Sequence, residues 1–99
     1  MNNKVFIYLD DLREAPEGYA RVKSVNEAIS LIESLEIQNI DIELIDLDHD
    51  LGDFSSDGGD AIKLLDWLVE RKTFYPVTLH TMNVVGRDNM QKIIDKYWK

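Results

Sequence analysis

The sequence contains no cysteine, and it has only two prolines and five glycines. Without cysteine the chain can form neither a disulfide framework nor a thiolate metal site, which fits a reducing compartment. No apolar run approaches the roughly 18–20 residues of a membrane span, and the apolar stretch near the N-terminus is too short for a signal peptide. We therefore expect a soluble, cytoplasmic protein without a membrane partner.

Positive charge is also scarce. Eleven basic residues stand against nineteen acidic ones, which gives a formal net charge of −8. A protein that binds nucleic acid through its phosphates needs clustered lysine and arginine side chains. The composition therefore excludes a basic nucleic-acid-binding face, and a phosphate ligand would need the help of a cation.

The chain does have enough apolar residues for one core: they make up 44% of its 99 residues, so we expect a single domain over residues 1–99. Short β-rich runs alternate with helical patterns in the order β-β-α-β-α-β-α. Right-handed crossovers then predict a small parallel sheet of about four strands with helices on both faces. The predicted strands are 5–9, 19–23, 42–47 and 76–80. One predicted helix starts at Ser24, the second covers residues 57–72, and the third runs from about Met90 to the C-terminus.

Polar side chains follow three of these strands. The carboxyl ends of parallel strands lie at one edge of a sheet, and ligands bind there, so we expect these side chains to meet. They are Asp10 and Asp11 after the first strand, Asp48, His49 and Asp50 after the third, and His80 and Thr81 after the fourth.

A calcium loop is one interpretation of the acidic segment, because Asp46, Asp48 and Asp50 occupy the first, third and fifth positions of such a pattern. The sixth position is Leu51 where glycine is needed, and the twelfth is Asp57 where glutamate is needed. The segment before it also resembles a strand rather than a helix. These departures argue against a calcium loop.

A second interpretation is that the aspartates form turns and helix caps. This suits Asp53, Asp57 and Asp60 better than Asp48 and Asp50, and an Asp10–Asp11 pair can also cap a turn. The histidines could likewise be ordinary structural residues.

The third interpretation is a divalent cation. Two carboxylates about 4 Å apart repel by about 4 kcal/mol at an effective dielectric of 20, which favours a bound cation or a raised pKa. Mg²⁺ needs one or two carboxylates and accepts phosphate oxygens. Asp10, Asp11 and Asp48 are the candidate ligands, while His49 and His80 could divide into a general base and a general acid.

Four segments carry a resemblance to a known family: YLDDLR (8–13), DLDHDLGD (46–53), DGGDAIKLLDWL (57–68) and LHTMNVVGRDNM (79–90). Over nearly the whole chain the sequence resembles the cyclic-phosphate processing receiver domain, a divergent relative of response-regulator receivers. The resemblance implies a truncated flavodoxin-like fold. It also implies a site formed by Asp10, Asp11, Asp48, His49, Asp50, His80 and Asn83, with Arg13 and Asn89 as further members.

Several departures from related patterns matter. Residue 81 is threonine where the family has serine, which keeps the hydroxyl group, and residue 84 is valine where the family has proline. Residues 12–18 are too few for the first helix of an ordinary receiver, and the fifth strand with its phosphate-binding lysine is absent. Aspartyl phosphorylation in the usual manner is therefore in doubt.

We expect a metal-assisted phosphoesterase that acts on cyclic phosphates of nucleotides or RNA termini. His49, His80 and Asp50 would be catalytic, Asp10, Asp11 and Asp48 would hold Mg²⁺, and Arg13, Thr81, Asn83 and Asn89 would bind substrate. The alternatives are a receiver-derived phosphoacceptor or interaction module in signalling, and a non-catalytic sensor of cyclic nucleotides. The oligomeric state is left open.

Overall fold

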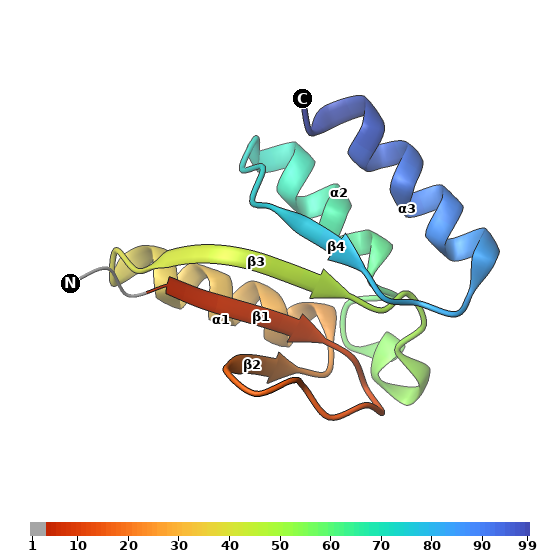
Figure 1. The fold of residues 1–99 in the computed structure, drawn as a ribbon, viewed down its shortest axis with the longest axis horizontal. Helices are drawn as coiled ribbons and strands as arrows, with labels where there is room; N and C mark the ends of the chain where they lie inside the picture. The colour runs from red at the N-terminus through yellow and green to blue at the C-terminus, as the bar shows by residue number, and fades with distance from the viewer. Residues whose placement is uncertain (1–3) are drawn as a thin grey trace.

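The computed structural model describes residues 4–99, and its four strands form one parallel sheet in the order β2-β1-β3-β4 (Figure 1). This is the order of the first four strands of a flavodoxin-like sheet. The predicted element order and the small receiver-like class are confirmed. No helix among these residues has the length and hydropathy needed to cross a membrane. The elements are β1 (Lys4–Leu9), β2 (Tyr19–Val22), α1 (Val25–Ile37), β3 (Asp41–Leu47), the 3-10 helix η1 (Gly52–Ser56), α2 (Ile62–Arg71), β4 (Val77–Leu79) and α3 (Val84–Tyr97).

The hydrophobic core lies between one face of the sheet and the three described helices. Figure 1 shows α1 behind β1 and β3, and α3 beside α2. Alternate residues of the strands point into this core, as the period of a β-strand requires. Its fully buried members include Ile7, Leu9, Ile45 and Leu47 from the sheet, Ile32 from α1, Leu65 and Leu68 from α2, and Met90 from α3.

The placing of the helices differs from the expectation of helices on both faces. The right-handed connections from β2 to β3 and from β3 to β4 cross the sheet in one direction, so their helices lie on one face. Only the connection from β1 to β2 runs the other way, and residues 10–18 form no helix. Among residues 4–99, no helix covers the second face.

The second face carries a row of aromatic and polar side chains. The ring of Tyr19 lies 5.3 Å from that of Phe6 and 6.1 Å from that of Tyr8. In register with these strands lie Leu44 and Asp46 of β3. Because this face has no helical layer, Asp46 keeps 19% of its side chain exposed in the middle of the sheet.

Helix α1 begins at the predicted cap. The Ser24 hydroxyl accepts a hydrogen bond from the Glu27 amide at 3.0 Å, while the Glu27 carboxylate accepts one from the Lys23 amide at 3.1 Å. The same hydroxyl donates to Asp57 at 2.7 Å, and the hydrogen bonds from Ser24 and Asn26 hold the pKa of Asp57 below its ordinary value. This capping residue therefore also ties α1 to the loop after η1.

Helix α2 begins at Ile62, whereas the sequence pattern predicted a start at Asp57. Gly58 and Gly59 have φ values of +109° and +90°, which belong to no right-handed helix. The loop before α2 is instead fixed by Asp60, whose carboxylate accepts a hydrogen bond from the Leu51 amide at 3.1 Å. The apolar stripe predicted the helix but not where it begins.

Candidate functional site

Asp10 directly follows β1 as a buried carboxylate that is 1% exposed. Its Oδ1 accepts hydrogen bonds from the amides of Leu12 and Arg13, each at 2.9 Å, and its Oδ2 lies 2.9 Å from His80 Nε2. Burial alone would raise the pKa of Asp10, but the amide bonds from Arg13 and Leu12 and the contact with His80 hold its pKa below the ordinary value. Asp10 therefore caps the turn and also presents an ionised oxygen to His80.

His80 follows β4 and lies between two carboxylates. Its Nδ1 is 2.7 Å from Asp46 Oδ1, and its Nε2 is 2.9 Å from Asp10 Oδ2. The ring stacks on Tyr8, with ring centres 4.4 Å apart and planes within 5°. Because ionised carboxylates only accept hydrogen bonds, both contacts are satisfied when both ring nitrogens carry protons.

His49 forms a separate pair with Asp50. Its Nδ1 lies 2.7 Å from Asp50 Oδ1, and its amide donates to Asp48 at 2.8 Å. Asn83 caps α3 by accepting a hydrogen bond from the Gly86 amide at 2.9 Å, and its amide group donates to Asp50 at 3.0 Å. The bonds from His49 and then Asn83 hold the pKa of Asp50 below its ordinary value.

A hollow of about 250 Å³ opens beyond the ends of the strands. It is lined by six of the predicted site residues and by three others, Leu12, Gly52 and Met82. Asp10, His49 and His80 do not line it, and Asn89 lies exposed on α3 outside it. The six are Asp11, Arg13, Asp48, Asp50, Thr81 and Asn83.

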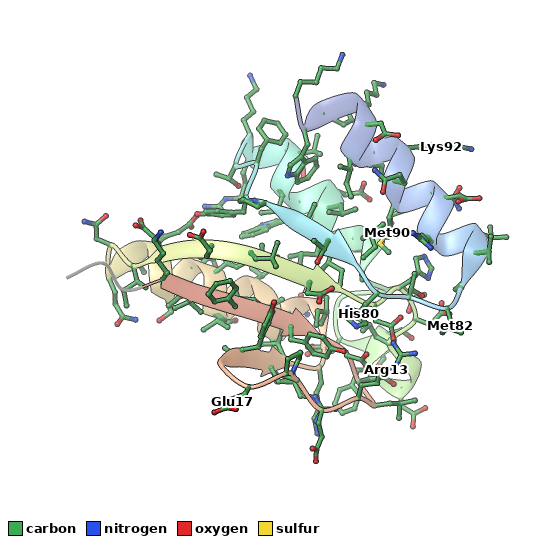
Figure 2. All side chains as sticks on the ribbon, viewed as in Figure 1. Arg13, Glu17, His80, Met82, Met90 and Lys92 are labelled. Atoms are coloured by element: carbon green, nitrogen blue, oxygen red, sulfur yellow. The ribbon has the colours of Figure 1, made fainter. Side chains whose placement is uncertain are left out.

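Among the described residues 4–99, Arg13 is the one basic residue that lines this hollow. Its guanidinium donates to the His80 carbonyl at 3.0 Å and lies 3.7 Å from Asp10 Oδ2, while 46% of the side chain is exposed. Figure 2 shows Arg13, His80 and Met82 at the carboxyl ends of the strands, and Lys92 pointing away on α3. A partly exposed positive charge therefore lies at this hollow among its acidic residues.

Candidate metal ligands gather in two groups. In the first, ligand atoms of Asp10, Asp48 and His80 lie within 4.8 Å of one another; the second comprises His49, Asp50 and Asp60. Two carboxylates and an imidazole form a donor set that suits a divalent cation, because carboxylates suit Mg²⁺ and Mn²⁺ and imidazole suits Zn²⁺ and Fe²⁺. These groups could therefore hold a divalent ion, whose identity the donor set does not fix.

The first group differs from the predicted ligand set. His80 takes part in it, although the sequence suggested an acid–base role, and Asp11 lies in the wall of the hollow but outside the group. Asp46, Asp48 and Asp50 form no common ligand group among residues 4–99, since Asp46 contacts His80 and Asp50 contacts His49. This arrangement offers nothing for a calcium loop.

Sequence reasoning missed two residues at this site, Asp46 and Tyr8. Both lie on the sheet face that no described helix covers. The available signal was the strand period: Asp46 is a charged residue within the apolar run of β3, at a position whose side chain points away from Ile45 and Leu47. A charged residue on that face needs a polar partner or access to water.

Comparison with known protein families identifies the chain. The model of a family described as the cyclic-phosphate processing receiver domain matches residues 5–96, which include all but the first residue of β1 and the last residue of α3 among the strands and helices. Searches of curated proteins and of solved structures found no match. On the family match, together with the four-stranded parallel sheet, the chain belongs to the cyclic-phosphate processing receiver domain family.

Proposed function

We propose that this protein is a metal-assisted phosphoesterase that opens cyclic phosphates in nucleotides or at RNA ends. The observation that carries the proposal is the grouping of Asp10, Asp48 and His80 within 4.8 Å, beside a hollow that also contains Arg13 and Asn83. The family description supports the substrate class.

The negative charge of the hollow is the reason why the proposal includes a divalent ion. Asp11, Asp48 and Asp50 line the hollow, and a dianionic or monoanionic phosphate would be repelled by them. A divalent ion held by Asp10 and Asp48 would neutralise phosphate charge and make bound water more acidic. Asp11 also lines the hollow, outside the candidate ligand group, where its carboxylate would be available as a further hydrogen-bond acceptor.

Opening the ring by hydrolysis needs two proton transfers. Water oxygen bonds to phosphorus and gives up a proton, while one ring P–O bond breaks and the leaving oxygen takes a proton. His49 suits the first step, because its Nε2 has no hydrogen-bond partner among residues 4–99 and Asp50 holds its Nδ1. In this scheme Asp10 and Asp48 alone would hold the ion, and His80, with a carboxylate at each ring nitrogen, suits the second.

Neither histidine lines the hollow, so each would exchange its proton through a water or an intervening carboxylate. The groups that would touch the phosphate directly are the Arg13 guanidinium, the Thr81 hydroxyl and the Asn83 amide. Thr81 is 9% exposed. Its hydroxyl oxygen accepts a hydrogen bond from the backbone N–H of Asn83 at 3.1 Å, which leaves the hydroxyl proton free to donate.

Two apolar side chains at the hollow favour a nucleotide over a simple cyclic phosphate. Leu12 and Met82 both line it and are 84% and 82% exposed. Exposed apolar groups beside a polar site offer a contact surface for the flat face of a nucleobase. The base would lie on Leu12 and Met82 while the phosphate faces Arg13 and Asn83.

The test uses purified protein with 2′,3′- and 3′,5′-cyclic nucleotides, in Mg²⁺, Mn²⁺, Zn²⁺ or EDTA. Product is followed by chromatography and ³¹P NMR. We expect turnover that EDTA abolishes and a divalent ion restores. His80→Asn and Asp48→Asn should each lower the rate about 10²-fold or more. Glu43→Gln, which alters a β3 carboxylate paired with Lys4 at 3.5 Å, is the matched control and should leave the rate unchanged.

Absence of turnover across the panel, or full turnover in His80→Asn, contradicts the proposal. A stable phosphoryl group on Asp48 after treatment with acetyl phosphate, lost in Asp48→Asn, would favour the signalling alternative. Saturable binding of a cyclic nucleotide without product would favour the sensor.

A further inference from the structure

We propose that this protein forms a symmetric dimer through a groove between α2 and α3. The groove has a volume of about 460 Å³. None of its lining residues lines the hollow beside the candidate site, so the inference does not depend on the proposed function. The lining residues are Asp66, Val69 and Glu70 of α2, and Lys92, Ile93, Lys96 and Tyr97 of α3.

The two walls of the groove carry opposite charges. The acidic wall consists of Asp66 and Glu70 on α2, and the lysine wall consists of Lys92 and Lys96 on α3. The two residues of each wall are four positions apart, so they lie on one face of their helix and about 6 Å apart along its axis. All four side chains are exposed. The groove therefore presents an acidic row beside a lysine row of the same spacing.

The charges of the two walls do not pair with each other. Among residues 4–99 every ion pair joins other residues, and the nearest example on α2 is Arg71, which binds Glu36 of α1. The Lys96 ammonium lies 5.1 Å from the ring centre of Tyr97. Both rows are therefore available to a second surface.

The floor of the groove is apolar. Val69 and Ile93 are half-buried, and Tyr97 is 40% exposed. Burial of apolar surface is the main favourable contribution to association, and tyrosine is enriched in protein–protein interfaces. Charged residues at the rim of such a surface determine which partner it accepts. An apolar floor between two charged walls therefore has the composition of an interface.

The directions of the two helices determine which partner fits. Helices α2 and α3 lie on the same face of the sheet and are associated with the parallel neighbours β3 and β4, and Figure 1 shows that they run in the same direction. A two-fold axis along the groove keeps this direction and exchanges the walls. The acidic wall of each protomer then faces the lysine wall of the other, and the two floors face each other.

This symmetry identifies the partner as a second copy of the chain. An interface that uses the same surface on both copies closes at two subunits. Each chain has a net charge of −8, so two copies repel unless the lysines of one meet acidic residues of the other. The rotation about the groove produces that match twice, once for each lysine wall.

Sedimentation equilibrium of the purified protein tests the dimer. One chain has a mass of 11.5 kDa, and we expect twice this mass for the wild type. The dimer should predominate at a concentration of about 100 μM, which is sufficient for a weak but specific interface. A wild-type protein that is monomeric at this concentration contradicts the proposal.

Two double variants test the arrangement of the walls. Asp66→Lys with Glu70→Lys makes both walls basic, and Lys92→Glu with Lys96→Glu makes both walls acidic. Each double variant alone should dimerise about 10²-fold more weakly, because like charges then face each other. An equimolar mixture of the two should form a heterodimer with an affinity within about tenfold of the wild type, because every wall again meets its opposite.

Glu17→Lys with Glu33→Lys is the matched control. It changes the net charge as much as the first double variant does, at exposed positions outside the groove, and should leave dimerisation unchanged. Circular dichroism establishes that each variant is folded. A dimer that tolerates either double variant, or folded variants that do not associate when mixed, overturns the proposal.

A further variant keeps the test decisive if a double variant fails to fold. Tyr97→Ser removes an exposed ring from the floor of the groove without changing any charge. It should weaken dimerisation about tenfold, because aromatic side chains in the centre of an interface contribute most to its affinity. An unchanged affinity in Tyr97→Ser contradicts the placing of the interface at this groove.

Discussion

The imidazole of His49 lies directly against the backbone of Gly86 in the first turn of α3. A Cβ atom at residue 86 would lie 2.5 Å from Cγ of the ring and 2.7 Å from Nδ1, distances far inside van der Waals contact. The Gly86 amide at the same point donates to Asn83, which in turn contacts Asp50. The absence of a side chain at residue 86 therefore lets α3 approach the end of β3 closely enough to join the two halves of the site.

Gly86→Ala should lower the free energy of unfolding by about 1–3 kcal/mol, because overpacking costs more than the helix propensity that alanine gains. Urea denaturation measures this loss. Asn89→Ala, at an exposed position of the same helix, is the control and should change stability by less than about 0.5 kcal/mol. A Gly86→Ala protein as stable as the wild type would show that the ring moves aside freely.

Binding of Mn²⁺ should depend on Asp48 more than on Asp11. Only Asp48 belongs to the group with Asp10 and His80, although both aspartates line the hollow. We expect Asp48→Asn to weaken Mn²⁺ binding at least about tenfold and Asp11→Asn to weaken it less, since a carboxylate outside the group acts only through water. Titration followed by electron paramagnetic resonance measures both affinities. Equal losses would place Asp11 among the ligands.

The apolar side chains at the hollow should affect nucleotides selectively. Met82→Ser and Leu12→Ser should each raise KM for a cyclic nucleotide about 3–10-fold, because a buried apolar contact contributes on the order of 1 kcal/mol. A base-free cyclic phosphate of ribose should be unaffected. Ile37→Ser, at a side chain that is 85% exposed at the end of α1, is the matched control. Equal effects on both substrates would mean that the base does not contact these residues.

Acid should weaken the hydrogen bonds that Arg71 and Tyr75 make to Glu36, which stabilise the fold away from the site. Burial alone would raise the pKa of Glu36, but the bonds from Arg71, at 2.6 Å, and from Tyr75 hold its pKa below the ordinary value. A lowered pKa contributes stability above the unfolded value of about 4.3, and this contribution disappears as the pH falls through the folded value.

Glu36→Gln should therefore cost about 1–2 kcal/mol at pH 7, and progressively less as the pH falls from the unfolded value of about 4.3 through the lower pKa of the folded carboxyl. Thermal unfolding at a series of pH values checks the trend. Tyr75 stays neutral throughout, because burial and then Glu36 raise the pKa of its hydroxyl to about 12. A stability difference that is constant between pH 7 and pH 2 would contradict the role given to the Glu36 charge.

The order of strands and helices could be predicted from the sequence because each element has its own period. Apolar runs and alternation located β1, β2, β3 and β4, apolar stripes located the three helices, and Ser24 marked the start of α1. The start of α2 could not be found in this way, since Asp57 satisfies the rules for a cap while the dihedral angles of Gly58 and Gly59 depend on the contact of the loop with α1.

The site was predicted in part for a related reason. Residues after a strand end could be assigned to one edge of the sheet from topology alone, and Asp10, Asp48 and His80 do lie together there. Asp46 lies within a strand, so its contact with His80 depends on the register of β3 against β4 and on which face the helices leave open. Neither follows from a hydrophobic pattern when helices are expected on both faces.

Because the described helices cover only one face of the sheet, solvent reaches the residues around His80 from two sides, at the hollow and at the open face. Leu12, Met82 and Arg13 surround the mouth through which a substrate would enter, while Asp46 contacts solvent on the bare side of the sheet and does not line that mouth. The His80 imidazole thus has one nitrogen at Asp10, in the candidate ligand group, and the other at Asp46, whose side chain is partly exposed on the open face of the sheet. A substitution on the open face of the sheet can therefore reach this imidazole without altering any group that lines the hollow.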